Sequence, residues 1–138
     1  MSLTDSFPRG EKKYELVLDQ RIILTGATLY RIRALKDFGN VKAGDLGGFV
    51  ASERNLSQLG DCWVSGDAQV YDDAVVSDDA QIFGCARVYD HARISDKGQV
   101  LGNAQVFENG WVFKKGLVFD NAMVFGDAQV RDLSLIHI

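Results

Sequence analysis

The sequence contains few of the residues that usually build metal, redox or catalytic centres: two cysteines and two histidines among 138 residues, with a single proline. Cys62 and Cys85 lack the CxxC spacing of zinc and redox motifs and are too few for a disulfide framework. Both are predicted to be reduced thiols. No metal site and no cofactor is therefore expected.

Long apolar runs are also missing. No stretch approaches the roughly 18 apolar residues that a membrane-spanning helix needs. The first residues, MSLTDSFPRGEKK, lack the apolar middle of a signal peptide. We expect a cytoplasmic protein with no membrane partner.

An excess of positive charge is absent where a nucleic-acid binder would need it. Residues 1–59 carry nine Lys or Arg against seven Asp or Glu, whereas residues 60–138 carry six against twelve. Six of these acids precede Arg87: Asp61, Asp67, Asp72, Asp73, Asp78 and Asp79. Because the protein surfaces that bind nucleic acids are basic, direct nucleic-acid binding is not expected, and a basic partner is favoured.

A six-residue repeat fills the second half of the chain. One aliphatic residue recurs at every sixth position: Val64, Val70, Val76, Ile82, Val88, Ile94, Val100, Val106, Val112, Val118, Val124 and Val130. A small residue lies two positions before each, as in Ala68, Ala74 and Gly98, and a turn pair such as Gly66-Asp67 or Asp72-Asp73 precedes it.

This period fits a coil with three flat sides. Residues two apart on a strand point to one face, so the small and aliphatic residues are predicted to line the inside. Gly, Asp and Asn accept the positive φ of sharp corners. The sequence predicts an all-β fold, a single-stranded parallel β-helix over residues 60–132, with three hexads in each 18-residue coil and about four coils.

The pattern resembles the hexapeptide-repeat, left-handed β-helix superfamily, in which a small residue follows an aliphatic one by four positions. Val64 with Ala68 and Val70 with Ala74 comply. The resemblance implies a left-handed helix and a homo-oligomer. The chain departs from the superfamily where aromatic residues, such as Tyr71 and Phe83, directly follow the aliphatic one.

A narrower resemblance lies in LYRIRALKDFGNVKAGDLGGFV and NLSQLGDCWVSGDAQVYDDA. These runs are similar to an uncharacterised family of phages, prophages and gut bacteria, whose members are sometimes labelled transferases on fold alone. The resemblance implies the cytoplasm of a bacterial host as the location. A label based on fold does not establish an activity.

The two ends are predicted to differ from the repeat. Residues 1–59 are expected to form a tail and a small β cap, with strands at Tyr14-Leu18, Arg21-Leu24 and Thr28-Leu35 and turns at Asp19-Gln20 and Thr25-Gly26. The run Ala43-Gly44-Asp45-Leu46-Gly47-Gly48 is predicted to be a structural turn, because it lacks the Lys-Ser/Thr of a P-loop. Residues 133–138, LSLIHI, match a translated sequencing-adaptor end and are predicted to be an artefact. The alternative is a natural apolar tail that closes the last coil.

Aromatic residues form predicted columns on the outside of the coils, because residues 18 apart stack. One column is Tyr71, Tyr89, Phe107 and Phe125, and further aromatic side chains lie on the other sides: Phe83, Phe119, Trp63 and Trp111. Three interpretations remain open: rings that stabilise stacked strands, an oligomer interface, and a carbohydrate-stacking surface. The six early aspartates form a second candidate surface, either a mimic of a row of phosphates or ordinary turn residues.

Three function hypotheses follow. The first is a non-enzymatic binding or scaffold protein of phage or mobile-element origin, which inhibits a host nuclease or defence complex, as an anti-CRISPR does, by protein-protein contact. The second is a hexapeptide-type acyltransferase, for which His91 would be the general base, although a lone corner histidine is more often a turn residue. The third is a β-helical component of a virion.

Overall fold

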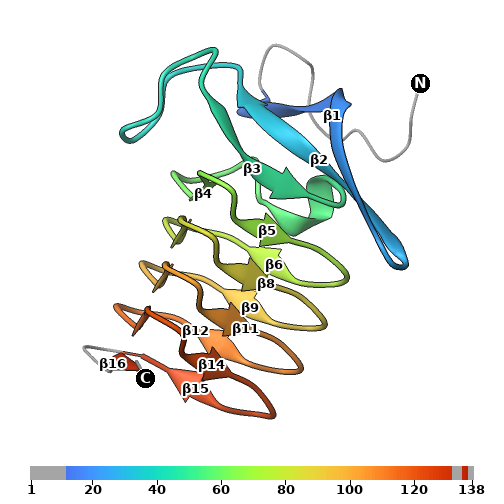
Figure 1. Cartoon of the computed structure of the whole chain (residues 1–138). Helices are drawn as coiled ribbons and strands as arrows, with labels where there is room; N and C mark the ends of the chain where they lie inside the picture. Colours follow the sequence, from blue (N-terminus) through green and yellow to red (C-terminus); the bar gives the residue numbers. More distant parts are fainter. Residues whose placement is uncertain (1–11, 132–134, 137–138) are drawn as a thin grey trace.

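The computed structural model describes residues 12–131 and the backbone of residues 135–136. The chain from β3 onward winds into a parallel β-helix whose coils stack in one direction (Figure 1). Its two-residue strands are β4 (Trp63–Val64), β5 (Gln69–Val70), β6 (Val75–Val76), β7 (Gln81–Ile82), β8 (Arg87–Val88), β9 (Arg93–Ile94), β10 (Gln99–Val100), β11 (Gln105–Val106), β12 (Trp111–Val112), β13 (Leu117–Val118), β14 (Met123–Val124), β15 (Gln129–Val130) and β16 (Leu135–Ile136).

The predicted all-β fold, a parallel β-helix with 18-residue coils, is confirmed. Val70 pairs with Val88, which lies 18 residues later, and the same register joins Val88 to Val106 and Val106 to Val124. Three sheets result: β3-β5-β8-β11-β14, which β2 and β1 extend, β4-β7-β10-β13-β16, and β6-β9-β12-β15. The handedness taken from the resemblance stays a prediction.

The core is the predicted double column of aliphatic and small residues. Val64, Val88 and Val106 are completely buried, as are Ala68 and Ala86. Fully burying one valine contributes about 1.5 kcal/mol or more, so the column is the main source of stability. The corners need a left-handed backbone, and seven non-glycine residues supply it: Asp72, Asp78, Asp90, Asp96, Glu108, Lys114 and Asp120.

Parallel pairing begins before residue 60. The strand β3 (Leu46–Val50) pairs with β5 so that Val50 lies beside Val70, and an isolated bridge joins Leu56 to Val76. Both offsets are 20 residues rather than 18, because two residues are inserted between Leu56 and Val64. The first sheet therefore contains five stacked parallel strands, one more than the four predicted coils.

An antiparallel hairpin continues this sheet at the N-terminal end of the stack (Figure 1). It consists of β1 (Tyr14–Leu24) and β2 (Ala27–Ala34), and the predicted turn at Thr25-Gly26 joins them. The turn predicted at Asp19-Gln20 is wrong: β1 runs through these residues, with a register shift against β2 between Val17 and Arg21. That the hairpin serves as a cap stays a prediction.

The run of residues 43–48 is only partly a turn. Gly44 has φ +93°, as a turn glycine does, but Leu46, Gly47 and Gly48 belong to β3. After β3, the short 3-10 helix η2 (Glu53–Asn55) leads into the remainder of the first coil. Asn55 is buried there, and its amide donates hydrogen bonds to the carbonyl oxygens of Asp72 and Ala74.

A buried lysine joins the N-terminal segment to the first coil. The Lys13 ammonium donates to the carbonyl oxygens of Gly60 and Cys62, at 3.2 and 2.7 Å, and lies 3.3 Å from Cys62 Sγ. Burial lowers the pKa of Lys13 and raises the pKa of the Cys62 thiol. These hydrogen bonds compensate part of the cost of removing the ammonium from water.

The predicted adaptor tail lies mostly outside the described residues. Only the backbone of β16 is described there, and it pairs with β13 in the usual register, Ile136 beside Val118. Its origin stays a prediction. No described helix is long and apolar enough to span a membrane.

Candidate functional site

The predicted aromatic column is a continuous stack of four rings, which we call the aromatic ladder (Tyr71, Tyr89, Phe107 and Phe125). Successive ring centroids are 5.2, 5.2 and 5.5 Å apart, with interplanar angles of 6°, 4° and 13°. The Tyr89 hydroxyl donates to Gln105 Oε1 at 2.9 Å. Because the rings cover one another's faces, mainly their edges are open to a partner. Phe125, at the end of the stack, is 52% exposed.

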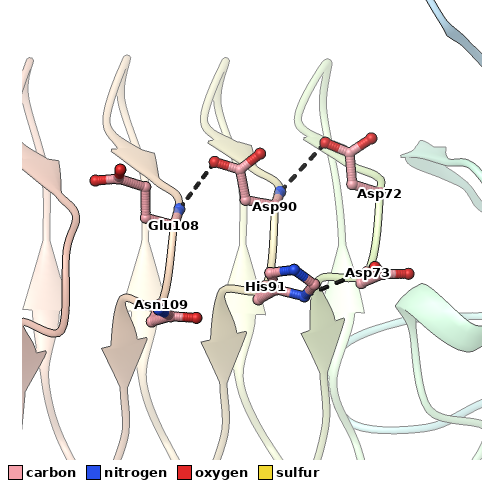
Figure 2. Close-up of a pocket in the computed structure, with 6 residues that line it drawn as sticks. All are labelled: Asp72, Asp73, Asp90, His91, Glu108 and Asn109. Atoms are coloured by element: carbon pink, nitrogen blue, oxygen red, sulfur yellow. Dashed lines mark hydrogen bonds and ion pairs between the residues drawn. The ribbon is translucent and has the colours of Figure 1, made fainter.

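An acid directly follows the aromatic residue in three successive coils: Asp72, Asp90 and Glu108. Figure 2 shows these three residues in one column, with Asp73, His91 and Asn109 in the column beside it. We call this set of six the acidic corner. The corner lines an open, shallow pocket.

The carboxylates of the acidic corner connect one coil to the next. The Asp90 amide donates to Asp72 Oδ2, the Glu108 amide to Asp90 Oδ2 and the Gly126 amide to Glu108 Oε1, at 3.3, 3.0 and 3.0 Å. Each carboxylate thus accepts a hydrogen bond from a backbone amide at the corner of the following coil. The residue that donates has a left-handed backbone conformation in each case. One oxygen of each has a structural role, and the other has no hydrogen-bond partner within residues 12–131.

The histidine singled out from the sequence lies in this corner. His91 Nδ1 is 3.6 Å from Asp73 Oδ2, and both side chains are mostly exposed, at 69% and 61%. Asp73 is also 3.9 Å from Arg54 of η2, which partly offsets the negative charge. A contact of this length between two exposed side chains does not hold the imidazole in one orientation for catalysis.

The remaining aromatic candidates differ in accessibility. Trp63, predicted to face a partner, is 4% exposed, because Tyr14 and Phe38 pack edge-on against its ring. Trp111 is half-buried, stacks on Phe113 and donates to Ser95 Oγ at 3.0 Å, while Arg93 lies over its ring. Phe83 and Phe119 are half-buried and directly follow β7 and β13, two strands of the sheet β4-β7-β10-β13-β16.

The other predicted acids are spread over separate corners. Asp61 and Asp79 do stack, since the Asp61 amide donates to Asp79 Oδ1 at 3.1 Å. Asp78 repeats the coil-to-coil bond by accepting from the Asp96 amide at 3.0 Å. Asp67 lies 3.7 Å from Arg31 of β2. The six predicted acids therefore do not form one surface.

Two acids of the corner were missed at the sequence level. Asp90 and Glu108 lie 18 and 36 residues after Asp72, so the coil period could have found them. Within residues 12–131, no three His, Cys, Asp or Glu side chains are placed to hold a metal ion.

The repeat is similar to one known family of repeats. The family described as the YdcK beta solenoid repeat matches residues 68–84, a stretch about one coil long. The match agrees with the stacked parallel strands, which show the fold. The chain is a β-solenoid repeat protein. No curated protein matches the solenoid. The match concerns a repeat of the β-solenoid and carries no information on what the solenoid binds.

Proposed function

We propose that the chain is a non-catalytic binding protein, which acts by protein-protein contact through three carboxylates of the acidic corner, Asp72, Asp90 and Glu108, and through the aromatic ladder beside them. The observation that supports this proposal is the repeated aromatic-acid pair, at Tyr71-Asp72, Tyr89-Asp90 and Phe107-Glu108, held in two adjacent columns by the coils. Apolar ring edges beside a row of carboxylates favour a partner surface that combines apolar and basic groups.

A nuclease or another complex that handles nucleic acid is the partner class we propose. Carboxylates that repeat with the coils are spaced about 4.8 Å apart, which is of the same order as the phosphate spacing of about 3.4 Å along the axis in one strand of duplex DNA. A rigid row of carboxylates can therefore occupy Lys and Arg residues that would otherwise bind phosphates. The resemblance to a phage family makes a host defence complex of the CRISPR type the first partner to test.

Carbohydrate stacking receives less support than protein binding. A sugar ring packs on an open aromatic face, but in the ladder each inner ring is covered on both faces by its neighbours at 5.2 to 5.5 Å.

Affinity capture from a bacterial lysate with active CRISPR and restriction complexes tests the proposal. The variant Asp72→Asn/Asp90→Asn removes two charges but keeps the acceptor oxygens and a residue type that tolerates positive φ. The matched control, Asp78→Asn/Asp96→Asn, makes the same changes at another corner with the same hydrogen bonds. We expect stoichiometric recovery of a nuclease complex, weakened about tenfold or more by the first variant only.

Equal recovery by the two variants, or capture of no nuclease complex by the unaltered protein, would contradict the proposal. Partners are identified by mass spectrometry, and affinity is then measured on the purified complex. Inhibition of DNA cleavage by that complex, lost in parallel with binding, would link the contact to the function.

Acyl transfer is the second candidate, because His91 and Asp73 form the one His-carboxylate pair of the acidic corner. The carboxylates around His91 would repel the phosphates of an acyl-CoA donor. Because His91 is exposed, we expect His91→Ala to leave partner capture unchanged and to alter the free energy of unfolding by less than about 0.5 kcal/mol. A large loss of activity with a retained fold, together with acyl-CoA binding by the unaltered chain in calorimetry, would favour the enzyme instead.

A further inference from the structure

The outermost strand of the first sheet, β1, has one edge without a strand partner in the described part of the chain. The sheet order runs β1-β2-β3 and continues through the coils, so β2 pairs with only one side of β1. At 11 residues, β1 is also long for an edge strand. Long apolar edges invite pairing with another strand, and proteins usually shorten, cover or charge them.

The residues of β1 have an internal symmetry about Gln20. On either side of Gln20, one charged residue is followed by three apolar residues. The order along the strand is Leu16-Val17-Leu18-Asp19-Gln20-Arg21-Ile22-Ile23-Leu24. The charges on the two sides are opposite. A strand of this kind is complementary to an antiparallel copy of itself.

The middle of β1 is also the part that its own hairpin uses least. Val17 lies opposite Arg31 and Arg21 opposite Tyr30, so Leu18, Asp19 and Gln20 face no residue of β2. Leu18 is 63% exposed and Ile23 is 76% exposed, the two most exposed large apolar side chains on the strand. Apolar side chains so exposed on both sides of a charged centre are expected where a partner covers them.

We propose that two copies of the chain pair antiparallel through β1, with the twofold axis at Gln20. Asp19 of each copy then lies opposite Arg21 of the other, which forms two symmetric ion pairs. Leu18 lies opposite Ile22, Val17 opposite Ile23 and Leu16 opposite Leu24. A twofold contact requires a self-complementary surface, and only a second copy supplies all of these pairs at once.

Charge reversal distinguishes this contact from other dimers. In sedimentation equilibrium, the unaltered protein should approach twice its 15.2 kDa mass at up to about 300 µM, since small interfaces are often weak. Asp19→Arg alone and Arg21→Asp alone should each weaken the dimer at least about tenfold. In either variant, residues 19 and 21 carry the same sign of charge, so both symmetric pairs become repulsive. An equimolar mixture of the two variants should restore the dimer, since every pair is then opposite in sign.

The control is Lys115→Asp, an exposed charge reversal at a coil corner, which should leave the dimer unchanged. A second measurement uses Gln20→Cys in a Cys85→Ser background, because Cys85 is the exposed native thiol. A cysteine on the axis lies opposite its own copy, so mild oxidation should crosslink most of the protein. A monomer at all concentrations, a dimer insensitive to both reversals, or no crosslink through residue 20 would overturn the proposal.

Discussion

Replacing Val106 by aspartate should unfold the solenoid or lower its free energy of unfolding by several kcal/mol. Val106 is completely buried and lies in register between Val88 and Val124, in a column that contains only apolar side chains. An ionised carboxylate there would have no partner, and burying an unpaired charge costs several kcal/mol. Because the free energy of unfolding of a domain is typically about 5 to 15 kcal/mol, one such change removes a large part of it.

Urea unfolding followed by circular dichroism measures this loss. The matched control is Gln99→Asp, which adds the same charge at an exposed position of another coil, and its expected change is below about 0.5 kcal/mol. If Val106→Asp unfolded at the same urea concentration as Gln99→Asp, the column would not be the source of stability.

The coils could be predicted because one six-residue period determines both faces of every strand. Val64 and Ala68 had to point inward together, and the corner residues had to accept positive φ, as Asp72 and Asp78 do at φ 56° and 59°. No long-range information was needed, since each coil packs only on its neighbours.

The first coil was missed because its spacing departs from the period. Val50 and Leu56 are six apart, and Gly48 precedes Val50 by two, which is the repeat pattern. The two residues inserted before Val64 interrupt the series there. Which outward residues the N-terminal segment covers could not be predicted either. Trp63 occupies the same strand position as exposed Gln99, but Tyr14 of the hairpin and Phe38, which follows it, bury the Trp63 ring.

The candidate site was predicted in part. The period located the aromatic ladder, because residues 18 apart must stack, and the rings lie at 5.2 to 5.5 Å as the coil spacing requires. The sequence alone could not show that Asp72 and Asp90 each accept from the amide of the next coil. Those bonds depend on the left-handed corners and give the acids a structural role as well as a charge.

Gly47→Ala should be the second severe change, because β3 approaches β4 and β2 too closely for a side chain. A Cβ at Gly47 would lie 2.4 Å from the Val64 carbonyl oxygen, 2.6 Å from Ile32 Cγ1 and 2.7 Å from Trp63 Cζ2. One of these contacts is with backbone, which cannot move without breaking the pairing of β4. Overpacking of this kind costs about 3 kcal/mol, and the urea midpoint should fall accordingly.

Gly98→Ala adds the same methyl group at a position where neighbouring hexads already have alanine, at Ala80, Ala92 and Ala104. Its nearest contacts would be Val112 Cγ1 at 3.0 Å and the carbonyl oxygens of Val112 and Ser95 at 3.1 and 3.2 Å. All three are longer than the contacts at Gly47, so the expected loss is smaller, about 1 kcal/mol. A smaller loss for Gly47→Ala than for Gly98→Ala would mean that β3 can move away from β4. The close contacts at Gly47 would then not fix the position of β3, and the hairpin would be held on the solenoid by contacts such as that between the buried rings of Tyr14 and Trp63.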